Sequence, residues 1–262
     1  MENPEETLRL ELKTDPSTIR RQAIWCGLSS GMRVLDAACG PGKSTAILYE
    51  MIQPGGKILG LDTSNERIQY AKATYANNKN IDFRVQDLRG SFKGLGNFDL
   101  IWARFVLEYF RVEGPDIVRN LGSCLKPGGT LCLIDLDYNC LSHYELPKQM
   151  EDILIKLIIL LEEKHDFDPY IGRKLYSYLY DLGYQNIQAD MRPHHLIYGE
   201  VHEKDMFNWL KKVEVVSSKE EWLFKSYPGG HNGFFVDFKR FFADPRRFTY
   251  TPLIMCKGTK PV

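Results

Sequence analysis

The sequence predicts an α/β fold in which a doubly wound sheet of seven mostly parallel strands carries helices on both faces. Short apolar stretches alternate with helix-forming stretches up to about residue 140, and alternation at this spacing is typical of βαβ units. The same Pro-Gly-Gly sequence precedes two expected strands, at residues 53–57 and 126–130, where proline stops a helix and glycine takes a left-handed turn. Beyond residue 140 the pattern changes, which predicts a C-terminal helical and aromatic insertion over the edge of the sheet that carries the active site.

Strands are expected at residues 33–36, 57–62, 81–85, 98–102, 130–136, 186–191 and 251–257. Helices are expected at residues 16–28, 44–52, 63–75, 115–125, 146–164, 172–182 and 204–215. The first helix opens at Asp15-Pro16-Ser17, and the second stops before Pro54. Thr63 and Glu66 have the spacing of a capping box at the start of the third. Gly183 ends the helix that begins at residue 172.

Residues 217–247 are rich in aromatic side chains and are expected to be irregular. Tyr227-Pro228-Gly229-Gly230-His231-Asn232-Gly233 has the composition of a mobile loop and is expected to form a lid or a surface turn. No Pro/Ser-rich or charge-rich linker separates the two halves of the chain. We therefore expect a single domain over residues 1–262, with a helical extension at 1–29, a core at 30–140 and a last strand at 248–262. Residues 141–185 and 200–247 would cover the site.

The bulk composition restricts the class of protein. The 262 residues include 34 Lys and Arg and 34 Asp and Glu, so the formal net charge is zero and no strong attraction to nucleic acid or an anionic membrane is expected. The first 13 residues are acidic and lack the apolar segment of a secretory signal. No apolar run is long enough to insert into a membrane. The six cysteines form no C-x-x-C pair, so we expect buried, reduced thiols in a cytoplasmic protein with no metal site.

The stretch "VLDAACGPGKST", residues 34–45, contains a glycine-rich loop between the first expected strand and helix. A phosphate-binding P-loop needs a glycine at position 37, where Ala37 stands. The dinucleotide fingerprint needs a third glycine where Thr45 stands, and Asp36 before the loop would repel a pyrophosphate. Asp36 suits a ligand with a cationic group, and Lys43 is expected to point to solvent.

The Asp36-Ala37-Ala38-Cys39-Gly40-Pro41-Gly42 segment resembles the first motif of the class I S-adenosylmethionine-dependent methyltransferases. The later strand ends fit the same family: Gly60-Leu61-Asp62, Val85-Gln86-Asp87-Leu88 and Phe98-Asp99-Leu100-Ile101, with Lys126-Pro127-Gly128-Gly129 before the fifth strand. The resemblance implies a Rossmann-like fold and S-adenosyl-L-methionine as cofactor, with S-adenosyl-L-homocysteine as product. It is good over residues 30–140 and poor over 217–245.

The resemblance also implies roles for individual residues. Asp62 would accept hydrogen bonds from the two ribose hydroxyls, Asp87 would accept one from the adenine amino group, and Leu88 would pack on the adenine ring. Ala103 and Arg104 would line the methionine end. The full cofactor site would comprise Asp36, Ala38, Gly40, Gly42, Asp62, Thr63, Asp87, Leu88 and Arg104.

The acceptor is expected to be a small, partly apolar molecule that is methylated by direct displacement. The Asp/Asn-Pro-Pro-aromatic motif of enzymes that methylate base amines is replaced here by Trp102-Ala103-Arg104-Phe105, and the Pro-Cys of cytosine-C5 enzymes is missing. Residues 171–175 and 182–184 resemble a segment of small-molecule methyltransferases of the ubiquinone and menaquinone type. Aromatic side chains of residues 217–247 would enclose the acceptor, cover the sheet or form the seam of a homodimer.

A proton acceptor is needed only if the nucleophile must lose a proton. Candidates are Glu108 after the fourth strand and Asp137, Tyr138 and His143 after the fifth. His194 and His195, after the sixth strand, are weaker candidates. The alternatives that remain are a protein or RNA methyltransferase, a catalytically silent cofactor-binding regulatory subunit and, more distantly, an NAD-dependent oxidoreductase.

Overall fold

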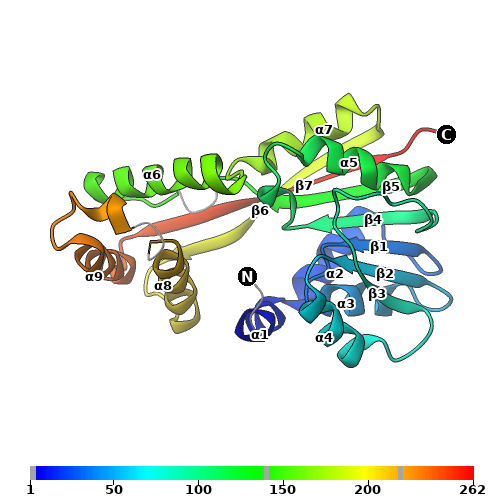
Figure 1. The fold of residues 1–262 in the computed structure, drawn as a ribbon, viewed down its shortest axis with the longest axis horizontal. Coiled ribbons are helices and arrows are strands. Elements are labelled where there is room, and N and C mark those ends of the chain that lie inside the picture. The colour runs from blue at the N-terminus through cyan, green and yellow to red at the C-terminus, as the bar shows by residue number, and fades with distance from the viewer. Residues whose placement is uncertain (1–3, 139–141, 218–220) are drawn as a thin grey trace. The chain divides into compact units, whose positions relative to one another are not determined.

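The computed structural model describes residues 4–138, 142–217 and 221–262, which form a seven-stranded sheet in the order β3-β2-β1-β4-β5-β7-β6 (Figure 1). The strands are β1 (Arg33–Ala37), β2 (Lys57–Asp62), β3 (Ile81–Val85), β4 (Phe98–Arg104), β5 (Leu125–Leu136), β6 (Gln185–Tyr198) and β7 (Phe248–Thr259). Strands β1 to β5 pair in parallel. The predicted fold class, a doubly wound and mostly parallel sheet, is therefore confirmed.

The helices are α1 (Pro4–Lys13), α2 (Pro16–Cys26), α3 (Lys43–Met51), α4 (Asn65–Tyr75), α5 (Gly114–Ser123), α6 (Lys148–His165), α7 (Leu175–Asp181), α8 (Glu203–Ser217) and α9 (Gly230–Ala243). Helices α2 to α8 lie close to their expected positions, whereas α9 falls in a segment that was expected to be irregular. Short 3-10 turns are η1 (Leu107–Tyr109), η2 (Ile171–Lys174) and η3 (Glu221–Phe224).

The chain divides into two compact units. Unit 1 comprises residues 1–135, 173–190 and 254–262, and unit 2 comprises residues 136–172 and 191–253. Unit 1 contains β1 to β4, nearly all of β5, and helices α1 to α5 and α7. Unit 2 contains α6, α8 and α9 with parts of β6 and β7.

In unit 1 the sheet has a helical layer on each side. Helices α2, α3 and α4 lie together on one side, and α5 and α7 lie together on the other (Figure 1). Four of the five residues of β1 are buried, and so are all residues of β2 after Lys57. Strands covered on both faces are apolar almost throughout, which explains why these segments show no polar alternation. Trp102 of β4 is fully buried at the centre of this unit.

The helix starts are set by short polar side chains. Asp15, one of the three residues at which the sequence predicted the start of this helix, caps α2 by accepting hydrogen bonds from the backbone N–H groups of Ser17 and Thr18. The Thr18 and Ser17 hydroxyls also donate to its carboxylate, and these side-chain bonds are the main reason that the pKa of Asp15 lies well below its usual value. The predicted capping box at Thr63 is wrong. Ser64 is the N-cap of α4, and its hydroxyl accepts a hydrogen bond from the backbone N–H of Arg67, because Asp62 fixes the backbone of Ser64.

The cysteines of the described residues are all free and buried, at positions 26, 39, 124, 132 and 256. Burial raises the pKa of Cys256 to about 11, which disfavours the thiolate and hence its reactivity. Cys140 lies outside the described residues.

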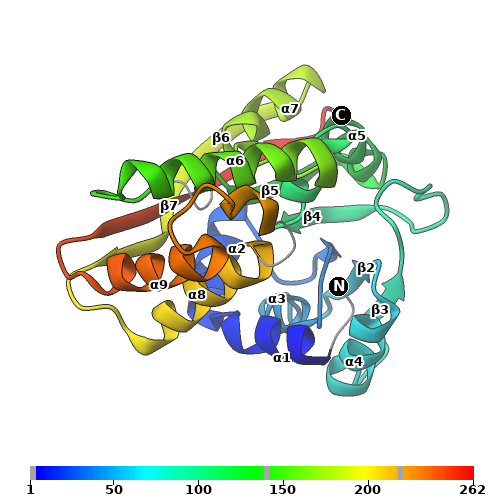
Figure 2. The ribbon, with the colours of Figure 1, turned by 60° about the vertical axis from the view of Figure 1, so that its left-hand side comes forward.

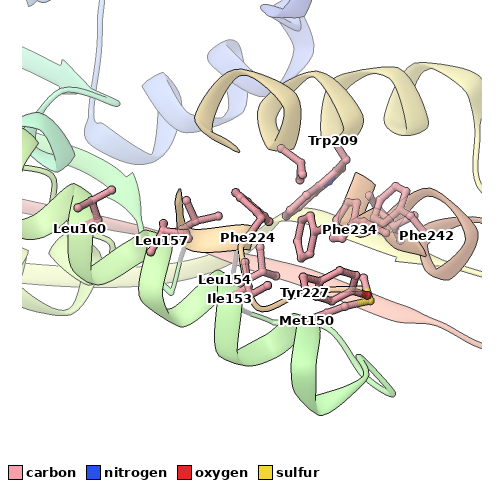
Figure 3. Close-up of a cluster of buried hydrophobic side chains, with 14 residues drawn as sticks. Met150, Ile153, Leu154, Leu157, Leu160, Trp209, Phe224, Tyr227, Phe234 and Phe242 are labelled. Carbon is pink, nitrogen blue, oxygen red and sulfur yellow. The ribbon is translucent and has the colours of Figure 1, made fainter. Parts of the chain in front are cut away.

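Unit 2 has its own hydrophobic core, drawn in Figure 3. It comprises Met150, Ile153, Leu154, Leu157, Leu160, Ile197, Trp209, Val213, Leu223, Phe224, Tyr227, Phe234, Phe238 and Phe242. Helices α6, α8 and α9 of this unit lie near one another (Figure 2). Helix α6 contributes an aliphatic face, and α8 and α9 contribute the tryptophan and most of the phenylalanines (Figure 3). Aromatic rings supply much of the apolar area of this core.

The expectation that residues 217–247 are irregular is wrong for most of this segment. Residues 230–243 form α9, and residues 221–224 form η3, while residues 218–220 lie outside the described part. Phe234, Phe238 and Phe242 recur every four residues and are fully buried, so they form one face of a helix. The glycine-rich stretch at residues 227–233, expected to form a lid or a surface turn, is the turn that leads into the first residues of α9, with Gly229 as the left-handed N-cap.

Arg247 is a buried cation that ties together the backbone of unit 2. Its guanidinium donates hydrogen bonds of 2.9, 2.7 and 2.8 Å to the carbonyl oxygens of Phe242, Ile197 and Gly199, and it lies 5.0 Å from the centre of the Phe242 ring. The side chain is 1% exposed, and burial lowers its pKa. The C-terminal end of α9 is thereby joined to the C-terminal end of β6.

Replacing Arg247 with Met should destabilise unit 2 by about 3 kcal/mol, because three buried carbonyl oxygens lose charged donors. Hydrogen exchange of the α9 amides would measure this loss. The neighbouring Arg246→Gln variant is the matched control. Its side chain is 73% exposed and forms only surface ion pairs, so its cost should stay below about 1 kcal/mol. Equal effects of the two variants would contradict the assigned role of Arg247.

Candidate functional site

The direction of strand order changes between β1 and β4. From β1 the chain proceeds outward to β2 and β3, and then returns to the other side of β1 to form β4 and β5. In open α/β sheets ligands bind at such a switch point, beyond the carboxyl ends of the strands. Ala37, the last residue of β1, pairs with Leu61 of β2 and Ala103 of β4, so these three strands end nearly level. The loops that follow them in unit 1 define the candidate site.

The loop after β1 has an unusual backbone. Ala38, Gly40 and Gly42 all have positive φ angles, of 62°, 57° and 94°, and a non-glycine residue rarely adopts this region. A Cβ on Gly42 would lie 2.8 Å from the side chain of Ala71 and 2.9 Å from that of Phe83, so this glycine allows close packing of the loop. A Cβ on Gly40 would meet nothing within 4 Å. The loop is therefore packed tightly at Gly42 and leaves open space at Gly40.

Asp62 at the end of β2 holds this loop in place. Its carboxylate accepts a 2.9 Å hydrogen bond from the backbone N–H of Gly40 and another of 2.9 Å from the backbone N–H of Ser64. The side chain is 6% exposed, and the Arg67 guanidinium lies 3.8 Å away. The backbone N–H of Cys39 also donates to the carbonyl of Leu61. The sequence-predicted residues Gly40 and Asp62 are thus brought into direct contact.

Asp36 at the end of β1 is 2% exposed, and its carboxylate accepts a 2.6 Å hydrogen bond from the Thr45 hydroxyl. Burial raises the pKa of Asp36 to about 7, although the Thr45 hydrogen bond and the Arg104 guanidinium act in the opposite direction. A nearby cation would favour the ionised form of this carboxyl group.

Three further predicted residues lie at the ends of β2 and β3. Leu88 is 3% exposed, and Thr63 is exposed. Asp87 is half-buried, and its carboxylate accepts hydrogen bonds from the backbone N–H and the guanidinium of Arg89, which lower its pKa. Asp87 is therefore ionised at neutral pH and held in one orientation.

Arg104, the last residue of β4, is half-buried. Its Nε donates a 3.0 Å hydrogen bond to the side-chain carbonyl oxygen of Gln22 on α2, and its guanidinium lies 3.9 Å from the centre of the Phe105 ring. Burial lowers its pKa to about 10, and the charges of Asp36 and Asp135 oppose this shift. Arg104 remains a cation at neutral pH and belongs to the same charged network as Asp36.

Asp135, near the end of β5, fixes the turn that follows β4. One of its carboxylate oxygens accepts hydrogen bonds from the backbone N–H groups of Val106, Leu107 and Glu108, at 3.1, 2.8 and 3.3 Å. The side chain is 1% exposed. Glu108, a predicted proton acceptor, lies in this turn and is 5% exposed. Three acids, Asp36, Asp62 and Asp135, are thus buried within unit 1 near the ends of β1, β2 and β5.

The other predicted proton acceptors lie in unit 2. Asp137 is 8% exposed, and Tyr138 is 38% exposed with its ring 5.9 Å from that of Tyr170. His143 lies within the aromatic core, with its Nδ1 2.8 Å from the Thr249 hydroxyl. The rings of Trp209, Phe238, Phe241 and Phe242 surround it. This packing stabilises unit 2 whether or not His143 also transfers protons.

Two further expectations are wrong. His194 and His195 do not follow the sixth strand but lie inside it, because β6 extends to Tyr198. Lys43 does not point to solvent. Its Nζ donates a 2.7 Å hydrogen bond to the backbone carbonyl of Glu11 and lies 3.8 Å from the Glu11 carboxylate, which also accepts a hydrogen bond from the Tyr75 hydroxyl. Lys43 and Tyr75 thereby attach α1 to α3 and α4.

Sequence reasoning missed Gln22, Thr45 and Asp135. Thr45 was considered only as the replacement for a glycine, although its place one helical turn after the loop allows a hydrogen bond to Asp36. Asp135 interrupts the apolar run Leu131–Leu136, and an acid inside a buried strand is a recognisable signal. No feature of the sequence points to a role for Gln22, because its partner Arg104 is 82 residues away in the chain.

Comparison with known proteins identifies the family. Residues 28–168, more than half of the chain, match the methyltransferase domain family, and the chain belongs to this family. Over 153 residues it is 29% identical to a demethylmenaquinone methyltransferase of Lactococcus lactis, covering 55% of this chain and 53% of that protein. Over 113 residues it is 34% identical to a ubiquinone biosynthesis O-methyltransferase of Xanthomonas campestris, covering 41% and 44%. The chain spans about half the length of the curated relatives it matches.

Solved structures share the fold. A protein from Bacillus halodurans C-125 matches with a TM-score of 0.62 at 17% identity, covering 94% of this chain and all of the other. A phosphoethanolamine N-methyltransferase of Haemonchus contortus, solved with S-adenosylhomocysteine, matches with a TM-score of 0.56 at 14% identity, covering 94% of this chain and 53% of the other. Within the described residues, no helix is both long and apolar enough to cross a bilayer.

The raised pKa of Asp36 leads to a pH-dependent stability. The folded protein keeps this proton up to about pH 7, whereas an unfolded aspartic acid releases it near its ordinary pKa of 3.8. The wild type should therefore lose about 2 kcal/mol of unfolding free energy, relative to Asp36→Asn, as the pH rises from about 5 to about 7. Urea unfolding of both proteins across this range would measure the difference.

Asp87→Asn is the control, because the pKa of Asp87 is lowered and its contribution is already complete above the unfolded value. The difference in unfolding free energy between Asp87→Asn and the wild type should stay constant over the same pH range. A constant difference for Asp36→Asn as well would contradict a raised pKa at this position.

Proposed function

We propose that this protein transfers a methyl group from S-adenosyl-L-methionine to a small, partly apolar acceptor, leaving S-adenosyl-L-homocysteine. The observation that carries this proposal is the glycine loop of unit 1, with open space at Gly40 and the buried acids Asp36 and Asp62 beside it. A cofactor with a sulfonium and an ammonium group and no phosphate suits such a site, whereas a nucleotide phosphate does not.

The residues present fit this cofactor. Gly40 leaves room for close approach of a ligand to the backbone, as a Cβ there would occupy the open space. Asp62 is oriented by two backbone N–H groups and would accept the ribose hydroxyls, while Asp87 and the buried Leu88 would hold the adenine. Asp36, Ala38, Gly42, Thr63 and Arg104 complete the proposed set. The bound cofactor would supply a methyl group activated by the positively charged sulfur.

The contribution of the chain is then to position the acceptor against the cofactor and to exclude water from the site. The Asp62 contact with Gly40 fixes the loop before any ligand arrives, so little ordering is required on binding. Glu108, Asp137, Tyr138 and His143 remain the candidates for moving a proton from an acceptor that needs it. Of these, Tyr138 is the most accessible, and Glu108 is fixed by Asp135.

Relatives named for quinone biosynthesis support a small-molecule acceptor, and the zero net charge supports it over nucleic acid. We propose that unit 2 carries the residues that select the acceptor, and that the protein acts in the cytoplasm, where its free thiols stay reduced. Labelled methyl transfer from the cofactor into cell extract, followed by separation by mass, tests the acceptor class. Label in the low-mass fraction is expected. Label only in protein or RNA would overturn the proposal that the acceptor is a small molecule.

Gly40→Ala tests the cofactor site itself. A methyl group at this position should raise the Kd for S-adenosylhomocysteine by at least about tenfold, because it fills the space that the ligand needs. Isothermal titration calorimetry would measure the affinity. Gly128→Ala is the matched control, since it places the same methyl group on another left-handed glycine with no neighbour within 4 Å, before the buried part of β5. Equal Kd values for the two variants would contradict the proposed site.

A further inference from the structure

A depression of about 230 Å³ lies on unit 1, away from the glycine loop, and its lining is strongly basic. Four cations line it, Arg33, Lys57, Lys79 and Arg84, and among the described residues Asp82 is the one acid of the lining. The formal net charge of the whole chain is zero, so this basic depression is a local concentration of one sign of charge. A concave surface of one sign focuses the electric field and attracts ions of the opposite sign.

The basic depression lies at the amino ends of three neighbouring strands. Strands β1, β2 and β3 lie side by side (Figure 1). Arg33 and Lys57 are register partners at the starts of β1 and β2, and Lys79 comes just before β3. At about 3.3 Å per residue, Lys57 is about 16 Å from Asp62 at the carboxyl end of β2. The depression is therefore at the opposite edge of the sheet from the candidate cofactor site.

The alternation of side chains along β3 explains which face carries the depression. Phe83 is fully buried on the side of α4, because a Cβ on Gly42 would contact both Phe83 and Ala71 of that helix. Asp82 and Arg84 flank Phe83 and therefore point to the opposite face. There they form an ion pair of 2.9 Å, with side chains that are 49% and 55% exposed. This face of β3 is thus accessible to a ligand.

Arg33 is held in a fixed orientation in the lining. Its guanidinium lies 5.0 Å from the centre of the buried Phe98 ring, and its Nη2 donates a 3.0 Å hydrogen bond to the carbonyl oxygen of Leu95. A Cβ on Gly96 would lie 2.7 Å from this nitrogen, so the glycine lets the loop approach Arg33 closely. In the part of the chain that the structure describes, Nε and Nη1 make no hydrogen bond. These donors of an oriented guanidinium remain available to the oxygens of an anion.

The charges of the two lysines are not balanced by the acids around them. Asp99 accepts a hydrogen bond from the backbone N–H of Arg33, but its carboxylate pairs with the Lys126 ammonium at 2.6 Å. Across residues 4–138, 142–217 and 221–262, Lys57 and Lys79 have no acidic partner. Their positive charges therefore add to that of Arg33 in one depression, and a bound anion would relieve the repulsion between them.

We infer that the basic depression binds a small polyanion of the diphosphate class, with Arg33, Lys57 and Lys79 supplying the positive charges. A diphosphate concentrates several negative charges on oxygens in a small volume, and guanidinium and ammonium groups both bind such oxygens. Asp82 and Asp99 border the basic surface and keep it short, which disfavours the long run of phosphates that a nucleic acid presents. The inference concerns a second site and does not depend on the proposed function.

Calorimetric titration with inorganic pyrophosphate tests this site. The wild type should bind it with a Kd of about 1 mM or lower. Changing Lys57→Gln and Lys79→Gln together should raise this Kd by at least about tenfold, because two of the three available charges are lost. The matched control combines Lys148→Gln and Lys211→Gln, which change the net charge equally at exposed positions of unit 2. Its Kd should stay within about twofold of the wild type, since salt screens distant charges.

Three results would overturn the inference. They are the absence of pyrophosphate binding to the wild type, an equal rise in Kd for the two double variants, and a rise of the same size for Gly40→Ala, which would place the anion at the glycine loop. Tighter binding of a single-stranded RNA than of pyrophosphate, weakened by the same two lysine changes, would assign the surface to nucleic acid instead.

The diphosphate could be free or part of an ester, and isopentenyl diphosphate separates these sources. This ligand carries a diphosphate on a short alkyl chain. Leu59 and Phe98 are buried apolar residues of the lining and would form a floor for that chain. A Kd lower than that of pyrophosphate would support an organic diphosphate as the ligand, whereas an equal or higher Kd would support recognition of the diphosphate alone. Both relations require that the two lysine changes weaken binding of the ester as well.

Discussion

The hydrogen bond from the Gly40 backbone N–H to the Asp62 carboxylate joins the loop after β1 to the end of β2, and the candidate site depends on it. The loop must keep three positive φ angles within five residues, which an isolated chain would not hold. Asp62 supplies the acceptor that stabilises this conformation and also fixes the start of α4 through Ser64. This carboxylate stabilises the loop even when no ligand is bound. Its removal would therefore affect both the conformation of the loop and the binding of a ligand.

The charges of unit 1 are unevenly distributed at this edge of the sheet. Asp36, Asp62 and Asp135 are buried near strand ends. The charge of Arg104 acts together with those of Asp36 and Asp135, and the Arg67 guanidinium lies 3.8 Å from Asp62. Each acid has hydrogen-bond donors of its own, which makes burial tolerable. The pKa of Asp36 is raised chiefly because burial disfavours its ionised form, and the charge of Asp62 adds to this shift. A cationic ligand near Asp36 would favour the ionised form, and a phosphate would disfavour it.

Local patterns allowed the sequence to predict most of unit 1, because its strands are short apolar runs and its turns carry proline or glycine. The glycine loop, Asp36 and Asp62 were found for the same reason: each stands at a strand end that the pattern identifies. Gln22 and the Glu11 contact with Lys43 were not predictable, since each joins residues far apart in the chain. Helix α9 was missed because glycines at its first turn outweighed the four-residue spacing of its phenylalanines.

The aromatic residues of unit 2 bear on how an acceptor would be selected. Phe224, Phe234, Phe238 and Phe242 are fully buried and pack against one another, with ring centres 5.0 to 6.1 Å apart between successive pairs. Side chains with no exposed surface form a core and do not line a pocket, so these rings stabilise unit 2 and do not enclose a substrate. Selection of an acceptor by unit 2 must then come from side chains that remain accessible. Tyr138 is such a residue, because its ring contacts that of Tyr170 and keeps an exposed part.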